Sequence, residues 1–187
     1  LPDNPVFLAT TSHGALKTSA TCIRHTGKGE TMLGSSPCHP TRAPQNTHIA
    51  EMMNRCIGPV TWRDDIETAL WQKLAVNCAI NPLTALNNIP NGGLLAAHYV
   101  ETITAVCEEV CAVARVCKIE LEVNTITEQV FNVIERTAEN FSSMHQDVIN
   151  KRTTEIEGIN GYIVNQAKKK GIDVPTNTLL YKAIKAL

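Results

Sequence analysis

The residues best suited to chemistry lie in one mostly apolar segment, 71–86, where polar side chains recur at four-residue intervals. Lys73, Asn77 and Asn81 occupy positions i, i+4 and i+8, a spacing that aligns them along one face of an α-helix. The residues between them are apolar, and a helix that is apolar nearly all round is normally buried. The polar stripe is therefore expected to be buried as well, or to line a cleft.

A single cation flanked by two amides can bind a small anionic or carbonyl compound, because buried polar groups require hydrogen-bond partners. A lysine ammonium can also donate a proton to a reacting oxygen. The pattern is equally compatible with a second interpretation, in which Lys73 extends to solvent and Asn77 and Asn81 bond to the backbone. Spacing alone leaves both interpretations open.

A second polar segment, around residues 142–157, is less informative. Ser143 and Gln146 fit a capping box at a helix N-terminus. Glu155 falls farther along the same expected helix, where glutamate is ordinarily solvated. His145 is a possible acid or base, but no carboxylate at a short spacing supports a relay, so we expect it at the surface or behind the site. A serine hydrolase is disfavoured because no G-x-S-x-G segment is present.

Composition excludes several classes of protein. Hydrophobic residues make up 43% of the 187 residues, which is enough for a packed core. The 17 basic and 18 acidic residues give a net charge of −1, so neither a nucleic acid nor an anionic membrane surface is expected as a partner. No apolar run reaches the ~18 residues that a membrane helix needs.

The seven cysteines are odd in number and lack a compact spacing, which favours reduced thiols and a cytoplasmic location. Cys107 and Cys111 are four apart in an apolar stretch, where free cysteine usually acts as a small hydrophobic residue. A zinc site is also conceivable near the start of the chain, but the spacing typical of structural zinc is absent. We therefore expect no metal; the residues considered were Cys22, His25, Cys38 and His39.

The first part of the chain has the pattern of β structure followed by one helix. A hairpin is expected, with Gly27-Lys28-Gly29 as its turn. An amphipathic helix is expected at 46–57, since Ile49, Met52, Met53 and Cys56 share a face. Strands are expected at 6–9, 16–26, 30–34 and 60–62.

From residue 64 onward the pattern is helical almost throughout. Pro82 is expected to end the first helix, because the residue before a proline is biased away from helical backbone. Lysines at 168–170 followed by Gly171 are typical of a helix end. Helices are expected at 64–81, 94–116, 125–138, 143–170 and 178–187.

These patterns divide the chain into a mixed α/β region, 1–62, and a helical region, 63–187. The first region is too short for a complete doubly wound domain, and no G-x-G-x-x-G segment occurs anywhere. The chain opens at Leu1-Pro2-Asp3 rather than at methionine. We therefore expect a piece of a longer protein.

Several blocks, in order and with matching gaps, resemble the ketopantoate reductase (2-dehydropantoate 2-reductase) family. The resemblance covers essentially the whole chain, and its first and third blocks are specific. An early segment, Thr10-Thr11-Ser12-His13-Gly14-Ala15, is also similar to the family's strand and loop. The blocks are KLAVNCAINPLTAL at 73–86, Asn91-Gly92, Ser142-Ser143-Met144-x-Gln146-Asp147, Thr154-Glu155-Ile156-x-x-Ile159-Asn160-Gly161 and Pro175-x-Asn177.

The resemblance implies a mostly α fold. Residues 63–187 would form an all-helical domain like the C-terminal domain of 6-phosphogluconate dehydrogenase, preceded at 1–62 by a short α/β remnant of a Rossmann domain. It also implies an active site between the two domains. The implied activity is NADPH-dependent reduction of 2-dehydropantoate to pantoate, a cytoplasmic step of pantothenate and coenzyme A biosynthesis.

The resemblance also assigns roles to particular residues. Lys73 matches the family's catalytic lysine, which protonates the substrate carbonyl oxygen as hydride arrives. Positions near the cofactor match Glu155 and Ala15. The positions that bind substrate match Asn77, Asn81, Asn91 and Ser143, with Asn140 nearby.

The family's glycine-rich phosphate loop would lie upstream of Leu1. We therefore expect the chain alone to bind NADPH very weakly and not to turn over. Two alternatives stay open: a reductase of another 2-oxo acid on the same fold, or a non-catalytic helical module that packs against a second copy. The full set of matched residues argues against the module, and homo-oligomerisation is left open.

Overall fold

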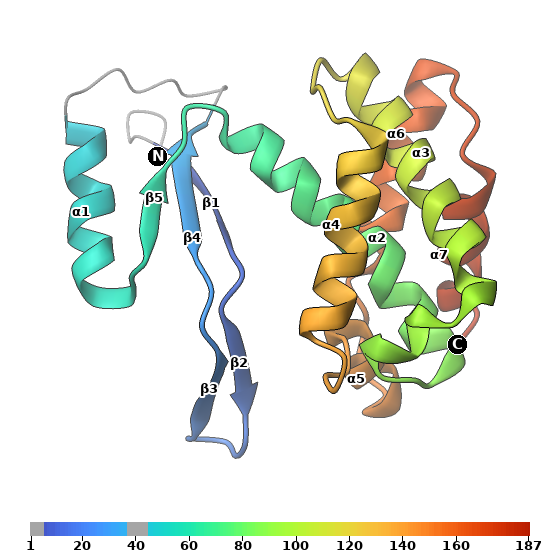
Figure 1. Cartoon of the computed structure of the whole chain (residues 1–187), viewed down its shortest axis with the longest axis horizontal. Helices are drawn as coiled ribbons and strands as arrows, with labels where there is room; N and C mark the ends of the chain where they lie inside the picture. The colour runs from blue at the N-terminus through green and yellow to red at the C-terminus, as the bar shows by residue number, and fades with distance from the viewer. Residues whose placement is uncertain (1–5, 37–44) are drawn as a thin grey trace. The chain divides into compact units, whose positions relative to one another are not determined.

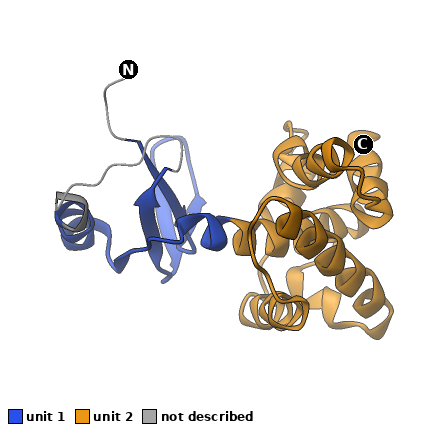
Figure 2. Cartoon of the chain, turned by 90° about the horizontal axis from the view of Figure 1, so that it is seen from above, with its two compact units in different colours: residues 1–70 blue, residues 71–187 orange. Residues whose placement is uncertain are grey.

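The computed structural model describes residues 6–36 and 45–187. The chain divides into two compact units, residues 1–70 and 71–187 (Figure 2). The first is mixed α/β and the second is helical (Figure 1). The expected mostly α fold is confirmed.

The first unit is built around a three-stranded sheet in the order β1-β4-β5. β4 (Thr31–Ser35) lies in the middle, antiparallel to β1 (Phe7–Thr11) and parallel to β5 (Val60–Trp62). α1 (Gln45–Ile57) precedes β5 in the chain and packs against it (Figure 1). Leu33 and Gly34 of the central strand are buried; a side chain at position 34 would collide with Arg63 and Ile66.

The expected hairpin is wrong in its turn and its pairing. β2 (Gly14–Lys17) pairs with β3 (Ile23–Gly27) in a separate two-stranded ribbon, closed by a turn at 18–22. Residues 28–30 instead lead from this ribbon into the main sheet. They are held by the start of the ribbon, because Ser12 Oγ accepts from the Glu30 amide at 2.9 Å and His13 Nδ1 accepts from the Gly29 amide at 3.2 Å. The glycines alone could not reveal these contacts.

The second unit packs helices around a core that centres on α3. The side chains on the inner faces of α3, α4 and α6 include Val106, Val110, Ile134 and Ile163, all fully buried. Its elements are the end of α2 (Ile66–Asn87), the 3₁₀ turns η1 (Asn91–Leu95) and η2 (Ala97–Tyr99), α3 (Val100–Val116), α4 (Val123–Arg136), α5 (Ser143–Ile149), η3 (Ile156–Gly158), α6 (Asn160–Lys170) and α7 (Pro175–Lys185).

Several helix boundaries agree with expectation. α1, α4 and the end of α6 lie within about two residues of their predicted limits. Gly171 follows α6 with a φ of 68°, a left-handed conformation that favours glycine. Among residues 6–36 and 45–187, no helix has both the length and the apolar character needed to cross a bilayer.

Other boundaries differ for identifiable reasons. α2 continues through Pro82 to Asn87 instead of ending at residue 81. The expected helix at 94–116 begins only at Val100, after the two 3₁₀ turns, and α7 begins at Pro175 rather than at 178. Proline is well accommodated in the first helical turn, where no intrahelical partner for an N–H exists.

The long helix expected at 143–170 is interrupted. α5 ends at Ile149, and the chain turns through Lys151, which has a φ of 53°. Arg152 then bonds back to Asp147 through its backbone amide, at 2.8 Å, and through its side chain, at 2.9 Å. Ser143 and Glu155 therefore do not lie on one helix.

Candidate functional site

Lys73, Asn77 and Asn81 lie along one face of α2, as their spacing predicts. Burial increases along this stripe: Lys73 is exposed, Asn77 is half-buried and Asn81 is only 7% exposed. Within the part of the chain that the structure describes, neither asparagine side chain has a hydrogen-bond partner. Lys73 therefore reaches solvent, as the second interpretation expected, but the asparagines do not bond to the backbone.

Ser142, not Ser143, caps α5. The Ser142 hydroxyl accepts a hydrogen bond from the His145 amide at 3.1 Å, and its backbone is extended. Ser142 Oγ also lies 2.7 Å from Thr84 Oγ1 of α2. The cap is thus one residue earlier than expected and the predicted capping box with Gln146 is not formed, which leaves Ser143 as an exposed residue in the first turn.

Asn91 connects η1 to the end of α4. Its side-chain Nδ2 donates to Thr137 Oγ1 at 2.9 Å, and its backbone amide donates to the Asn140 carbonyl at 2.8 Å. Asn91 is buried, and its Oδ1 has no partner among the described residues. This oxygen is buried from solvent, so a ligand could reach it only after neighbouring atoms move, whereas Asn140 is exposed and held mainly through its backbone.

His145 is buried, which places it behind the surface rather than on it. Its Nε2 lies 2.8 Å from Asn88 Oδ1, and its ring stacks on Phe141 with centroids 4.4 Å apart. Burial lowers the pKa of the His145 imidazole, which favours the neutral ring. Spacing gave no signal for these contacts, because Asn88 is distant in sequence.

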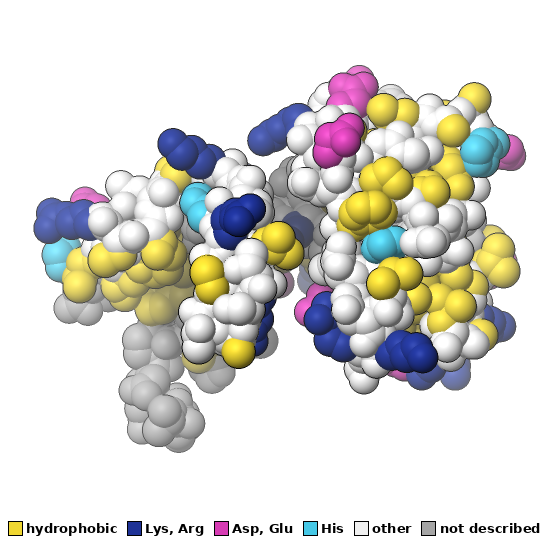
Figure 3. Space-filling view, turned by 90° about the horizontal axis from the view of Figure 1, so that it is seen from below, with side chains coloured by type: hydrophobic (Ala, Val, Ile, Leu, Met, Phe, Trp, Pro, Cys, Tyr) yellow, Lys and Arg dark blue, Asp and Glu magenta, His cyan; other side chains and the backbone are white. Residues whose placement is uncertain are grey.

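Phe141 is 45% exposed and belongs to a set of large apolar side chains on the helical unit that face solvent. Figure 3 shows hydrophobic side chains beside histidine on one face of this unit. Other members of the set are Leu95, Val100 and Ile149.

The two residues matched to the cofactor lie in different units. Ala15 is exposed on β2, in register with His25 of β3. Glu155 is exposed and precedes η3, where its carbonyl accepts from the Gly158 amide at 3.0 Å. Both are accessible to a ligand.

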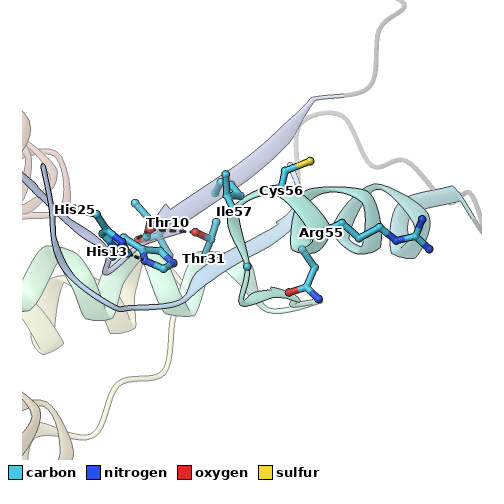
Figure 4. Close-up of a pocket in the computed structure, with 11 residues that line it drawn as sticks. Thr10, His13, His25, Thr31, Arg55, Cys56 and Ile57 are labelled. Atoms are coloured by element: carbon cyan, nitrogen blue, oxygen red, sulfur yellow. Dashed lines mark hydrogen bonds between the residues drawn. The ribbon is translucent and has the colours of Figure 1, made fainter. Parts of the chain in front are cut away.

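A pocket of about 770 Å³ in the first unit contains none of the expected site residues. His13 and His25 lie at one end, with His13 Nδ1 3.2 Å from His25 Nε2 (Figure 4). Thr10 and Thr31 are beside them, and Arg55 belongs to the α1 side of the pocket (Figure 4). No pattern in the sequence indicates this pocket, because its lining comes from separate strands and from the end of α1.

Within the described part of the chain, no group of three or more potential metal ligands gathers. Cys107 and Cys111 lie in the helical core, where burial raises the pKa of each thiol to about 11. Both thiols are therefore protonated at neutral pH. Cys38 and His39, considered above for zinc, fall outside the described residues.

Comparison with known proteins adds family information to this geometry. A family model described as "Ketopantoate reductase PanE/ApbA C terminal" matches residues 65–187. A 2-dehydropantoate 2-reductase from Vibrio cholerae serotype O1 is 46% identical over 183 residues, which cover 98% of this chain and 61% of that protein. The chain therefore spans about three fifths of the length of this curated relative.

Two solved structures are similar to the chain. A PanE/ApbA family ketopantoate reductase from Ralstonia eutropha JMP134 has a TM-score of 0.86 at 28% identity, covering 96% of this chain and 58% of that one. D-mandelate dehydrogenase, solved in complex with NADH, has a TM-score of 0.90 at 24% identity, covering 96% of this chain and 61% of that one. At that identity the second likeness concerns the fold alone.

Proposed function

The chain belongs to the ketopantoate reductase family, and we propose that it supplies the helical catalytic part of an NADPH-dependent enzyme that reduces 2-dehydropantoate to (R)-pantoate. The reaction is a step of pantothenate and coenzyme A biosynthesis. In this proposal residues 63–187 are the catalytic domain and residues 1–62 the end of a nucleotide-binding domain. The observation that carries it is the α2 stripe, where an exposed ammonium precedes two side-chain amides without partners.

Lys73 is the proposed proton donor. NADPH, when bound, supplies the hydride that adds to the carbonyl carbon of the substrate. The carbonyl oxygen then gains negative charge, which the Lys73 ammonium stabilises and neutralises by giving up a proton. The product is the alcohol, and neutral Lys73 regains its proton from water.

Asn77 and Asn81 are the proposed groups that bind substrate and orient the ammonium. Their amides do not ionise at ordinary pH, so they cannot compete with the substrate for the proton. Their lack of protein partners supports the assignment, since a polar group close to the core is normally hydrogen-bonded. A bound 2-oxo acid would supply those bonds.

Ser143, Asn140 and Asn91 complete the proposed substrate site. Because Ser142 provides the helix cap, the Ser143 hydroxyl is available to a ligand. Asn91 holds the turn that carries Asn140 through its backbone amide, and its buried Oδ1 has no partner among the described residues. All three lie in the helical unit, as do residues 71–87 of α2.

A nicotinamide nucleotide fits the exposed residues that the family match assigns to it. The Glu155 carboxylate can accept hydrogen bonds from ribose hydroxyls, and the Ala15 backbone is accessible in β2. The sequence carries no G-x-G-x-x-G segment for the pyrophosphate. We therefore propose that the cofactor phosphates bind to the part of the relatives that this chain does not span. NADPH rather than NADH is proposed because of the family resemblance.

We place the reaction in the cytoplasm, with a small-molecule 2-oxo acid as the partner. The cysteines of the described residues are free thiols, which is their usual state in a reducing compartment. Association of the protein with further copies of itself is included in the proposal. No nucleic-acid or membrane partner is invoked, in keeping with the net charge of −1.

Reduction of another 2-oxo acid is the second candidate function. The fold that the chain shares with D-mandelate dehydrogenase is compatible with it, because one fold can serve different substrates through local changes in the pocket. A panel of 2-oxo acids that differ in their side chains would separate the two candidates by relative kcat/KM.

The decisive experiment measures NADPH oxidation by the chain joined to the upstream nucleotide-binding segment of the Vibrio cholerae relative. With ketopantoate, Lys73→Ala should lower kcat by roughly 10²–10⁴-fold, the usual contribution of a positioned acid. Lys169→Ala is the matched control, since Lys169 is an exposed lysine at the end of α6, and its activity should be unchanged. A Lys73→Ala protein as active as this control would rule out the proposed role.

A further inference from the structure

Pro82 leaves one backbone carbonyl of α2 without its normal partner. In an α-helix the carbonyl of residue 78 accepts from the amide of residue 82, but proline has no N–H. Cys78, which carries that carbonyl, is fully buried, so water is a poor substitute. A buried carbonyl of this kind requires another donor.

The Asn160 side chain supplies that donor. Its Nδ2 lies 3.1 Å from the Cys78 carbonyl oxygen and 3.0 Å from Asn177 Oδ1. Asn160 is fully buried at the first position of α6. One amide therefore uses both of its N–H groups, one on the carbonyl opened by Pro82 and one on the next asparagine.

The contact continues to α3 through a chain of hydrogen bonds that ends at the half-buried Glu109. Asn177 Nδ2 donates to Glu109 Oε2 at 2.8 Å. The Glu109 carboxylate also accepts from the backbone amides of Asn177, at 2.8 Å, and Thr176, at 2.7 Å. It thereby caps α7 at its N-terminus, where a negative charge is favourable.

We propose that Asn160 is a positioning residue for the reductase reaction. By bonding to the Cys78 carbonyl, it fixes the turn of α2 that runs from Asn77 to Asn81. Pro82 lacks the amide that would bond to the Cys78 carbonyl, and the Asn160 side chain supplies that donor. Asn177, which is bonded to Glu109, accepts the second N–H of Asn160. This inference rests on the proposed function, since it assigns Asn160 a role in placing the substrate-binding amides.

The pairing of Pro82 with Asn160 has a consequence that ordinary packing would not produce. In a Pro82→Ala protein, residue 82 regains an N–H that can bond to the Cys78 carbonyl within the helix. Loss of the Asn160 amide should then be less damaging than it is beside proline. The two substitutions are therefore expected to compensate rather than to add.

The test is a double-mutant cycle in the chain joined to an upstream nucleotide-binding segment. The proteins are the unmodified form, Asn160→Ala, Pro82→Ala and the double variant. Asn160→Ala should raise the KM for ketopantoate about tenfold, the equivalent of one lost buried hydrogen bond, with a smaller change in the KM for NADPH. The double variant should recover at least about threefold of that loss.

Asn150→Ala is the matched control, because Asn150 donates its side-chain amide to the Gln146 carbonyl at 2.6 Å on the exposed end of α5. Its KM should be unchanged. Additive effects of Pro82→Ala and Asn160→Ala, or a KM in Asn160→Ala equal to the control, would overturn the inference. An unmodified joined protein that reduces no ketopantoate would instead contradict the proposed function.

Folding failure of Asn160→Ala leaves the test intact. If only the double variant folds, the recovery itself supports the link between Pro82 and Asn160. If neither folds, Asn177→Ala takes their place, since it keeps the Asn160 side chain but removes the partner that supports it, together with the Asn177–Glu109 side-chain bond. It should raise the KM for ketopantoate severalfold, and an unchanged KM would overturn the inference.

Discussion

We expect His145 to make the stability of the helical unit dependent on pH. Burial lowers the pKa of its imidazole, while the pKa of a histidine in an unfolded chain is about 6.5. As the pH falls, the unfolded chain therefore takes up this proton before the folded chain does. The contribution is fully present above the unfolded pKa and is lost as the pH falls through the folded pKa.

Urea unfolding at pH 7.5 and at about pH 5 tests this expectation. His145→Gln should lose less stability between these two values than the unmodified chain does, because glutamine does not titrate. His98→Gln is the control, since His98 is exposed on η2, and it should behave like the unmodified chain. The same pH dependence in His145→Gln and the unmodified chain would contradict the prediction.

Individual site residues differ in how far spacing reveals them. The alignment of Lys73, Asn77 and Asn81 follows directly from helical periodicity. All three lie in the continuous helix α2. Spacing cannot decide which of the adjacent serines 142 and 143 is the cap, because that depends on a hydroxyl contact with Thr84 on another helix. The burial of His145 likewise depends on tertiary neighbours.

At the scale of elements, the Thr84–Ser142 contact joins α2 to the start of α5. Thr84 Oγ1 lies 2.9 Å from the Ile80 carbonyl and 2.7 Å from Ser142 Oγ, and both hydroxyls are buried. Thr84→Val keeps the shape but leaves Ser142 without this partner. The free energy of unfolding should fall by about 1–3 kcal/mol, the cost of a buried polar group left unsatisfied.

Thr127→Val provides the comparison for Thr84→Val. Thr127 also bonds the carbonyl four residues earlier, Val123 O at 2.8 Å, but it lies partly buried in α4. In the chain joined to the upstream segment, Thr84→Val should also raise the KM for ketopantoate. Ser142 would lose its hydrogen bond to Thr84, and the proposed substrate residue Ser143 is next to it in the chain. Equal losses of stability and equal KM values in the two variants would refute this role of Thr84.

Element limits were predictable where the signals are local. The lysines and Gly171 end α6 as expected, because they act within the last turn. Pro82 did not end α2, since Asn160 of another helix bonds the carbonyl that proline leaves open. Gly27-Lys28-Gly29 did not form the hairpin turn, since contacts from residues 12 and 13 hold the segment.

At the scale of the whole molecule, hydrophobic periodicity was enough to separate a helical region from a preceding α/β region. The buried residues of the helical unit lie on the apolar helix faces that hydrophobic periodicity predicts. The pairing of the strands was not predictable, because the order β1-β4-β5 depends on contacts across the sheet rather than on alternation. The pocket between these strands and α1 was missed for the same reason.

The whole-molecule prediction concerns what this chain does without an upstream segment. The sequence offers no G-x-G-x-x-G loop for the cofactor phosphates, and the chain spans 61% of the Vibrio cholerae relative. Residues 1–187 alone should therefore show no turnover of ketopantoate and no saturable quenching of NADPH fluorescence at micromolar concentration.

The same chain joined to the upstream segment of the Vibrio cholerae relative should bind NADPH and oxidise it when ketopantoate is added. Changing the first glycine of the added G-x-G-x-x-G to a bulky residue is the control, and it should abolish NADPH binding while the helical unit stays folded. Turnover by residues 1–187 alone at a rate near that of the joined protein would mean that these residues hold the cofactor themselves. The exposed positions Ala15 and Glu155 would then have to bind it without a glycine loop.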